Sequence, residues 1–466
     1  MTGSFAARLD AAARRAPERV ALIDGARRLT YRDLDRRAGG VARRLAGDGL
    51  RTGDRVALAL PNGAGFAVAL YGALKLGLTV TPLNPQLTAE ERERILADFA
   101  PRAVLDAAPD GEADVDAAAT NAPALVLYTS GSTGRPKGAV LSQAALLAGN
   151  ESWRGPVMTL TPDDRVLAVL PLSHSYGVNG ALLAPLLAAA TVVVLERFTP
   201  EAVLGAVREH AVTVFPGVAT MFQRLLDTPG WSRDAFASVR MALSGAAPCP
   251  WPLAEAWRAR SGVRIFRGYG MTELFRPISY QAAEPRDLPD AIGRAVPGVE
   301  LRTVDDDGKD VATGEIGELL IRSDAAMDGY LEQPDETAVA LADGWFRTGD
   351  LARISDEGFV SIVGRKKELI LRGGYSVYPP EVEAALAAHP EVAEAAVIGV
   401  PHPDLGEEVA AFVALRPGAH ASAEDLVAWC KTRVAGYKCP RAITLVPELP
   451  KGPTGKVLKA ALRLSA

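Results

Sequence analysis

Short apolar runs alternate with helical patterns through the first half of the chain. The runs are RVALAL (55–60), ALVLYT (124–129), RVLAVLPL (165–172), TVVVLERF (191–198) and VTVFPG (212–217). The helical patterns include AGFAVALYGALKLG (64–77) and PEAVLGAVREH (200–210). Continuous apolar strands between helices are typical of parallel sheets that helices cover on both faces. We therefore predict a large α/β lobe with parallel-rich subdomains.

The pattern changes after about residue 291. Residues 298–323 and 351–364 alternate apolar with polar positions and contain Asp-Gly and Thr-Gly turns. This alternation is typical of antiparallel strands with one solvated face. We predict a β-rich subdomain that completes the large lobe.

A second set of elements is predicted after Gly364. It consists of a helix opened by Pro379 and Pro380, strands at 392–400 and 409–415, a helix with Ser422 and Asp425 at its N-terminus, and a strand at 442–446. The sequence thus predicts an N-terminal domain over residues 1–364 and a small mobile α+β domain over 365–466. The charged stretch GRKKE joins them.

The stretch from Val166 to Leu195 contains no charged residue and raises the question of a membrane span. Pro171, Pro185 and a polar run divide it, and the apolar remainder is shorter than the roughly 20 residues that a bilayer requires. We predict a buried strand, a loop, a helix and a second buried strand instead.

Composition limits the kinds of molecule that the protein is expected to bind. The chain has 466 residues and a net charge of −5, so no overall positive field attracts nucleic acid or an anionic membrane. We therefore expect a small-molecule partner and no integral membrane association. Three scattered cysteines make no disulfide framework, and the N-terminal segment reads as an amphipathic helix rather than a signal peptide. A cytoplasmic location is expected.

A glycine-rich loop, YTSGSTGRPKGAV (128–140), directly follows an apolar run. Its backbone N–H groups, hydroxyls and lysine supply many hydrogen-bond donors and no carboxylate, which suits a polyphosphate. The Walker P-loop spacing does not fit, because Pro136 stands where its second glycine belongs. A flexible surface loop is the alternative, but the defined Pro-Lys-Gly turn favours a phosphate site.

These residues carry a resemblance. YTSGSTGRPKGA is similar to the phosphate loop of the adenylate-forming superfamily, which includes acyl-CoA synthetases, peptide synthetase adenylation domains and luciferases. Further matches occur in the expected order: LPLSHSYG (170–177), SGAAP (244–248), GYGMTE (268–273), GELLIRSDAAMDGY (317–330), DGWFRTGD (343–350), GRKKELILRGGYSVYPPEVE (364–383) and PKGPTGKVLK (450–459). The resemblance covers essentially the whole chain and is closest to stand-alone acyl-CoA ligases.

The resemblance implies a site for ATP and Mg²⁺. It assigns the phosphates to Ser130, Gly131, Ser132, Thr133, Gly134 and Lys137. It places the adenosine and α-phosphate against Gly245, Ala246, Ala247, Tyr269, Gly270, Met271 and Thr272. Glu273 would hold Mg²⁺, Asp350 would accept the ribose hydroxyls, and Arg365 would reach the ribose and phosphates.

The C-terminal domain carries the sharpest implication. Lys456 would bridge the substrate carboxylate and the α-phosphate, since charge accumulates on the phosphoryl oxygens as pyrophosphate leaves. A solvated tail lysine is the alternative. By resemblance the small domain turns on Lys367 between an adenylating and a thioester-forming conformer. Gly373 and Gly374 would then line the path of the CoA pantetheine.

Residues beside the motifs are expected to select the acid. The predicted pocket comprises His174, Tyr176, Gly217, Val218, Met221, Ser244, Leu274 and Arg276. His174 is counted with Thr272, Glu273 and Lys456 among the catalytic residues, but as a gate, because an ionised carboxylate needs no general base. Arg276 is interpreted either as a partner for a second anionic group of the substrate or as half of an internal salt bridge.

The leading prediction is an ATP-dependent acid–CoA ligase that forms an acyl-adenylate, releases pyrophosphate and then makes a thioester with CoA. One alternative is a stand-alone adenylating enzyme that transfers to a carrier-protein phosphopantetheine or activates another oxyanion. A nonenzymatic nucleotide-binding scaffold is a third. Lys456, Glu273 and Asp350 argue against the scaffold.

Overall fold

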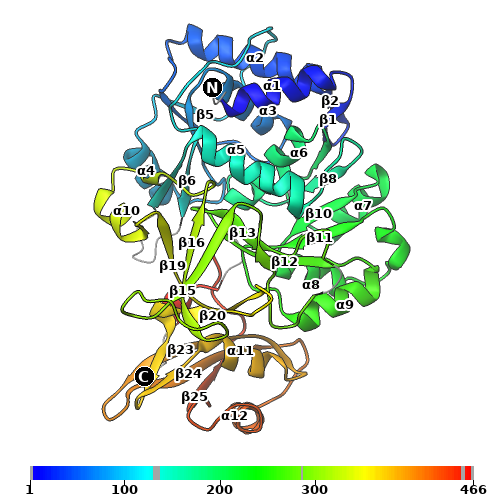
Figure 1. Ribbon diagram of the computed structural model, residues 1–466. Helices are drawn as coiled ribbons and strands as arrows, with labels where there is room; N and C mark the ends of the chain where they lie inside the picture. The colour runs from blue at the N-terminus through cyan, green and yellow to red at the C-terminus, as the bar shows by residue number, and fades with distance from the viewer. Residues whose placement is uncertain (1–3, 130–136, 285–286, 453–456, 463–466) are drawn as a thin grey trace. The chain divides into compact units, whose positions relative to one another are not determined.

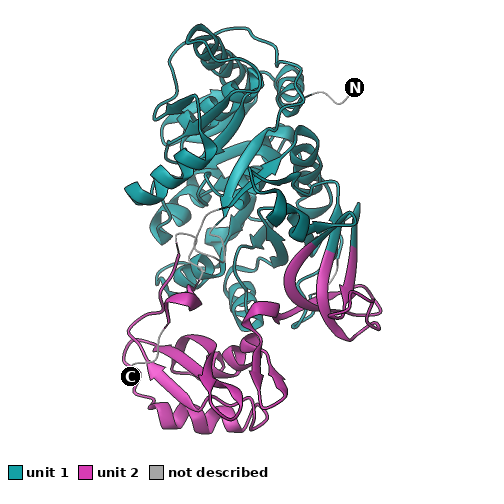
Figure 2. Ribbon diagram, turned by 90° about the vertical axis from the view of Figure 1, so that its left-hand side faces the viewer, with its two compact units in different colours: residues 1–300, 321–346 teal, residues 301–320, 347–466 magenta. Residues whose placement is uncertain are grey.

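The computed structural model describes residues 4–129, 137–284, 287–452 and 457–462. Contacts divide the chain into two compact units (Figure 2). Unit 1 comprises Met1–Glu300 and Ile321–Phe346, and unit 2 comprises Leu301–Leu320 and Arg347–Ala466. Unit 2 thus includes the predicted small domain and part of the predicted β-rich region. The domain boundary after residue 364 stays a prediction.

The largest sheet of unit 1 has nine strands. They are β1 (Val20–Asp24), β2 (Arg27–Thr30), β8 (Arg165–Ala168), β9 (Thr191–Val194), β10 (Val214–Gly217), β11 (Met241–Ser244), β12 (Ile265–Met271), β13 (Phe275–Ser279) and β14 (Arg294–Ala295). Their order is β14-β13-β12-β11-β10-β8-β9-β1-β2 (Figure 1). The strands from β1 to β12 pair in parallel, whereas β2, β13 and β14 are antiparallel. Parallel pairing brings the carboxyl ends of β8, β10, β11 and β12 to one edge.

A second sheet of unit 1 has six strands. They are β3 (Arg55–Leu58), β4 (Thr79–Pro82), β5 (Ala103–Leu105), β6 (Leu125–Thr129), β7 (Lys137–Leu141) and β17 (Gly329–Tyr330). The order is β17-β7-β6-β4-β3-β5, with parallel pairing from β6 to β5 and antiparallel pairing of β7 and β17. All five apolar runs predicted as strands are therefore strands of these two sheets.

Ten α-helices belong to the described part of unit 1. They are α1 (Phe5–Arg15), α2 (Tyr31–Gly47), α3 (Ala64–Lys75), α4 (Ala89–Phe99), α5 (Gln143–Ser152), α6 (Ala184–Leu187), α7 (Pro200–His210), α8 (Ala219–Asp227), α9 (Trp251–Ser261) and α10 (Pro334–Ala340). The side chains of Thr30 and Thr88 form capping boxes that start α2 and α4. The helices predicted at 64–77 and 200–210 correspond to α3 and α7.

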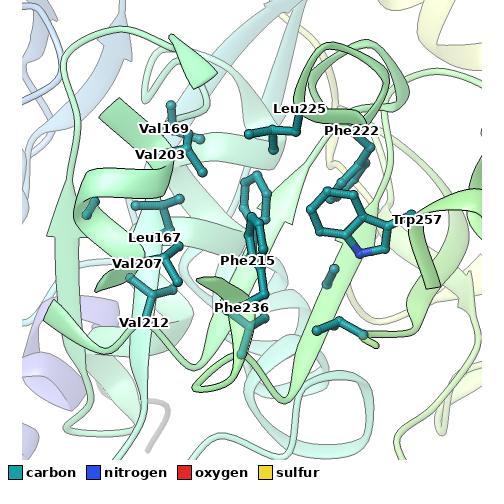
Figure 3. Packing of buried hydrophobic residues seen from close by; sticks show 14 of the residues in the cluster. Leu167, Val169, Val203, Val207, Val212, Phe215, Phe222, Leu225, Phe236 and Trp257 are labelled. Carbon is teal, nitrogen blue, oxygen red and sulfur yellow. The ribbon is translucent and has the colours of Figure 1, made fainter. Parts of the chain in front are cut away.

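An aromatic core packs α8 and α9 against the sheet beneath them (Figure 3). The ring centroids of Phe222 and Trp257 lie 4.9 Å apart, and those of Phe215 and Phe222 lie 5.1 Å apart. The ring centroid of Phe236 lies 4.9 Å from that of Trp257. Edge-to-face aromatic pairs of this kind add to the free energy of burial. This core holds β10 and β11, whose carboxyl ends lie at the candidate site.

The charge-free stretch from residue 166 to 195 folds as predicted. β8 is followed by a loop, by the π-helical segment η2 (Tyr176–Leu183) that continues into α6, and by β9. Within the described residues, we find no helix with the length and apolar content needed to cross a membrane.

The region after residue 291 is rich in β-strands, as predicted. It contains β15 (Val299–Val304), β16 (Ile316–Ser323), β18 (Leu341–Ala342), β19 (Trp345–Ile354) and β20 (Val360–Arg365). β19 and β20 pair antiparallel from Asp350 and Arg365 to Ile354 and Val360. The predicted alternation is incomplete in β16, because residues 317–321 are all buried.

The last hundred residues contain the predicted α+β elements. They are β21 (Ile370–Arg372), β22 (Tyr375–Val377), α11 (Pro379–Ala387), β23 (Val392–His402), β24 (Gly406–Leu415), α12 (Ala423–Lys431) and β25 (Ala442–Leu445). The sheet order is β22-β21-β24-β23, and β25 pairs in parallel with β24. Ser422 and Asp425 form the capping box of α12, as their spacing predicted.

Candidate active site

A cavity of unit 1 lies at the carboxyl edge of the nine-stranded sheet. It is lined by Trp153, His174, Ser175, Tyr176, Gly245, Ala246, Gly268, Gly270, Met271, Phe275 and Arg276. These residues come from the π-helical segment η1 (Trp153–Val157), from the segments that follow β8 and β11, and from β12 and β13. In open parallel sheets, ligands bind outside the carboxyl ends of the strands, so the position suits a small-molecule site.

The cavity brings two predicted groups of residues together. His174, Tyr176 and Arg276 were predicted to contact the acid. Gly245, Ala246, Gly270 and Met271 were predicted to contact the nucleotide. All seven line the same cavity. A site that joins an acid to the α-phosphate of ATP requires this proximity.

His174 lines the cavity as a neutral imidazole. The backbone N–H of Tyr176 donates to Nδ1 of His174 at 3.2 Å. Burial lowers the pKa of His174 to about 4, so its imidazole is neutral near pH 7.

The ring centroid of Tyr176 lies 5.3 Å from that of Trp153, and the Tyr176 hydroxyl donates to the carbonyl of Leu243 at 3.1 Å. Burial raises the pKa of Tyr176 to about 12.

Arg276 is held by neutral groups. Its Nε donates to Oγ of Ser279 at 3.0 Å, its Nη1 to the carbonyl of Ser244 at 3.1 Å, and its Nη2 to the carbonyl of Phe266 at 2.8 Å. Burial lowers the pKa of Arg276 from its usual value. The guanidinium nevertheless stays protonated near pH 7. The ion pairs among the described residues do not include Arg276, so the predicted internal salt bridge is not found in this part of the chain.

Close packing of β12 against β13 explains why Gly268 and Gly270, on either side of Tyr269, lack a side chain. A Cβ on Gly268 would lie 2.3 Å from Nε of Arg276, and one on Gly270 would lie 2.0 Å from the carbonyl oxygen of Phe275. Phe275 itself has a φ of 60°, which is unusual for a bulky residue. The absent Cβ atoms therefore allow β12 and β13 to approach closely around the arginine.

The other predicted pocket residues do not line this cavity. Gly217 and Ser244 are parallel partners at the ends of β10 and β11. Met221 packs against the aromatic core, and Val218 precedes α8. Leu274 lines a second cavity, to which Phe275 and Arg276 also contribute. Their predicted contacts with the acid stay predictions.

The predicted nucleotide residues of unit 1 lie on β12 and in the segments beside it. Tyr269 is half-buried and Thr272 is buried. Ala246 is exposed and has a φ of 64°, while Ala247 is half-buried. Ser130, Gly131, Ser132, Thr133 and Gly134 lie outside the described residues, and so does Lys456.

Glu273 is connected to Lys137 through an aromatic side chain. The hydroxyl of Tyr330 donates to Oε1 of Glu273 at 2.9 Å, and Nζ of Lys137 lies 5.1 Å from the ring centre of Tyr330. Lys137 also forms an ion pair with Glu336. Lys137 is the antiparallel partner of Thr129, so β6 and β7 hold the two ends of the glycine loop side by side.

The donor set around Glu273 fits Mg²⁺ bound together with a nucleotide. In the described chain, we find no group of three His, Cys, Asp or Glu side chains that would form a metal cage. Mg²⁺ is typically bound by one or two carboxylates, and substrate phosphates and water complete its octahedron. A single carboxylate, connected to Lys137 through Tyr330, is compatible with that mode of binding.

Asp350 and Arg365 lie together in unit 2. They are cross-strand partners in β19 and β20, and Nε of Arg365 lies 2.9 Å from Oδ1 of Asp350. Asp350 is 3% exposed, and its backbone N–H donates to Oγ1 of Thr348 at 3.0 Å. The ion pair orients the carboxylate, as a group that accepts two ribose hydroxyls requires.

The predicted hinge lies between two sets of ion pairs in unit 2. Lys367 is the middle residue of the 3₁₀ helix η4 (Lys366–Glu368). Lys366 lies 2.8 Å from Asp306, which precedes the hinge in sequence, whereas Glu368 lies 3.1 Å from Lys459 near the C-terminus. Gly373 and Gly374 form the turn between β21 and β22 with φ values of 55° and 83°. The turn therefore explains why both positions are glycine.

Sequence reasoning missed three residues of the candidate site. Trp153 and Phe275 form walls of the cavity, but neither belongs to a motif that marks a ligand. Tyr330 contacts Glu273 from a distant strand, and only its place in the motif GELLIRSDAAMDGY offered a signal. Contacts between segments far apart in sequence reveal all three.

The chain matches the family described as AMP-binding enzyme over residues 9–121 and 106–331, and the AMP-binding enzyme C-terminal domain over residues 381–456. It therefore belongs to the AMP-binding enzyme family. The predicted resemblance is confirmed.

Named relatives span the whole chain. A feruloyl-CoA synthase from Amycolatopsis sp is 35% identical, covering 97% of this chain and 96% of its own. A sulfoacetate–CoA ligase from Cupriavidus necator is 36% identical, covering 94% and 93%. The structure resembles o-succinylbenzoate CoA synthetase from Bacillus subtilis in complex with an acyl-adenylate intermediate, with a TM-score of 0.89, 29% identity and coverage of 98% of both chains. The predicted fold class, and the predicted class of AMP-forming acyl-CoA ligase, are confirmed at this level.

Proposed function

We propose that the protein joins a small carboxylic acid to CoA in two steps driven by ATP. In the first step, a carboxylate oxygen bonds to the α-phosphorus of ATP and the bond to pyrophosphate breaks. In the second step, the CoA thiol attacks the acyl carbon and AMP leaves. The observation that carries this proposal is the single cavity that joins His174, Tyr176 and Arg276 to Gly245, Gly270 and Met271.

Residues of unit 1 are assigned to the nucleotide. Tyr269 stacks on adenine beside Gly245, Ala246 and Ala247, and Thr272 contacts the α-phosphate. The glycine loop from Ser130 to Gly134, with Lys137, holds the β- and γ-phosphates. The antiparallel ends of β6 and β7 support this role, because they fix both ends of the loop.

Glu273 is assigned to Mg²⁺, which neutralises phosphate charge when it is bound. The hydrogen bond from Tyr330 limits the rotation of this carboxylate. Asp350 and Arg365 are assigned to the ribose and phosphates. Their ion pair and the burial of Asp350 support a fixed acceptor.

Lys456 is assigned to the α-phosphate and the attacking carboxylate. His174 closes the mouth of the acid pocket in its neutral form, and Gly217, Val218, Met221, Ser244 and Leu274 are assigned to the support of the residues that line it. Lys367 is the hinge on which the small domain changes conformer for the second step. The ion pairs on either side of it support this role, because each flank is anchored to different elements.

CoA is the proposed acceptor, since the named relatives are CoA ligases. No observation favours a carrier-protein phosphopantetheine or another oxyanion. The cytoplasm remains the predicted compartment.

Acid-dependent exchange of labelled pyrophosphate into ATP tests the first step, and mass spectrometry with and without CoA identifies the acceptor. We expect Lys456→Gln to lower exchange roughly 10²- to 10³-fold, as the loss of one positioned donor does. Lys451→Gln is the matched control, because Lys451 lies nearby in sequence and pairs with Glu394 at 2.6 Å. Exchange without any added acid, or equal losses in both variants, would contradict the proposal.

A further inference from the structure

The lining of the cavity carries one permanent charge. Among the described lining residues, Arg276 is the only Lys, Arg, Asp or Glu, and it is 4% exposed. Its three hydrogen-bond acceptors are two carbonyls and a hydroxyl. In this part of the chain no carboxylate lies within ion-pair distance of it. A buried charge with only neutral partners is costly, so a counter-ion from outside the chain would stabilise it.

The guanidinium is fixed in place and retains donors. Three of its five N–H groups donate to Ser279, Ser244 and Phe266, and the guanidinium also interacts with the hydroxyl of Tyr176. Its Cζ lies 5.4 Å from the ring centre of Trp153, across the cavity wall. Gly245 and Gly268 leave space for it, since a Cβ on Gly245 would lie 3.3 Å from Nη1. A rigid cation that retains an N–H donor suits recognition of a carboxylate or sulfonate oxygen.

Comparison with one buried and two half-buried arginines shows how the partners of Arg276 differ. Arg264 and Arg372 are paired with Asp287 and Glu408, respectively. Arg267 is as buried as Arg276 and also donates to carbonyl oxygens, but it does not line the cavity. Arg267 is therefore a matched control for the structural part of the role of Arg276.

We propose that Arg276 binds a second anionic group, a carboxylate or a sulfonate, at the end of the acid away from the reacting carboxylate. This inference rests on the proposed function and names its substrate class. A monocarboxylic acid would leave the buried guanidinium without a counter-ion. The enzyme should therefore discriminate against such acids, because a polar group built to bind a partner is left unpaired.

Matched pairs of acids test the inference: succinate against butanoate, glutarate against pentanoate, 3-sulfopropanoate against butanoate, and phthalate against benzoate. Pyrophosphate exchange gives kcat/KM for each acid with the wild type, Arg276→Met, Arg276→Lys and Arg267→Met. We expect the wild type to prefer the dianions, and Arg276→Met to lower their kcat/KM by about 10- to 100-fold while monoanions change little. Arg276→Lys should retain part of the preference. Arg267→Met should lower the melting temperature and leave the preference unchanged.

Equal losses for both members of a pair in Arg276→Met would overturn the inference and leave the proposed function standing. A wild type that uses monoanions as well as dianions would do the same, and this result decides the matter even if Arg276→Met does not fold. Exchange with none of the acids would overturn both.

Discussion

The hydroxyl of Tyr330 donates to Oε1 of Glu273 at 2.9 Å, although the two residues are 57 positions apart. Burial, with the nearby Glu273 carboxylate, raises the pKa of Tyr330 above its usual value, so the hydroxyl remains a donor. Tyr330 thus connects the strand β17 to the carboxylate that we assign to Mg²⁺.

Tyr330→Phe should weaken the use of Mg²⁺ without unfolding the chain. The variant removes one hydrogen bond that orients Glu273, and outer partners of a metal ligand typically contribute about 10- to 100-fold in metal affinity or activity. The measurement is the Mg²⁺ concentration that gives half-maximal pyrophosphate exchange. Tyr31→Phe is the control, because the hydroxyl of Tyr31 donates at 2.6 Å to the carbonyl of Ala190 instead. An unchanged Mg²⁺ requirement in Tyr330→Phe would refute this role.

His174 should make the protein less stable as the pH falls. Its folded-state pKa is about 4, below the usual 6.5, so the unfolded chain binds the proton more readily between these values. The free energy of unfolding should therefore decrease from pH 6.5 to pH 4, by at most about 3 kcal/mol from this residue. Denaturant unfolding of the wild type and His174→Gln at several pH values measures the difference. Parallel pH profiles would show that His174 does not contribute.

A buried ionic cluster should stabilise unit 1 without affecting chemistry. Lys75 is 1% exposed and lies 2.8 Å from Asp10 and 2.9 Å from Asp35. The single O–H of Tyr71 lies within hydrogen-bond distance of both carboxylates. Lys75→Met leaves two carboxylates without their cation, and breaking a buried pair costs about 3–5 kcal/mol. Thermal or denaturant unfolding should detect the loss, while kcat/KM per folded molecule stays near that of the wild type. A loss of activity without a loss of stability would contradict this assignment.

Lys367→Pro should separate the two half-reactions. Proline fixes φ and removes a backbone donor, which restricts rotation at the proposed hinge. Pyrophosphate exchange should continue, whereas formation of the CoA thioester should fall by at least about tenfold if rotation controls that step. Lys367→Ala is the control, because it removes the charge and keeps backbone rotation at this residue. Equal effects of Lys367→Pro on both steps would exclude a hinge at this residue.

Periodicity and motif order predicted most of the fold because its strands are continuous apolar runs and its helices begin at recognisable caps. The start of α12 after Ser422 follows from a capping box, in which Asp425 stands three residues after Ser422. Gln143 shows the limit of such reasoning. Its Oε1 accepts a hydrogen bond from the backbone N–H of Phe5 at 2.9 Å. A contact over 138 residues leaves no local trace in the sequence.

The candidate site was predicted where chemistry fixes the residue type, as for His174, Gly270 and Arg276. The walls of the cavity were not, because Trp153 and Phe275 are ordinary core residues until tertiary packing brings them to the site. Local sequence does not reveal the role of Gly268 either. Its absent Cβ provides room for Arg276, which lies on the neighbouring strand.

The most direct test of the central claim follows one oxygen atom. The acid is labelled with ¹⁸O in its reacting carboxylate and incubated with the protein, ATP, Mg²⁺ and CoA. If an acyl-adenylate forms and CoA then displaces AMP, one labelled oxygen must appear in AMP and the other must remain in the thioester. Labelled phosphate with unlabelled AMP, or a thioester formed without AMP, would contradict the account.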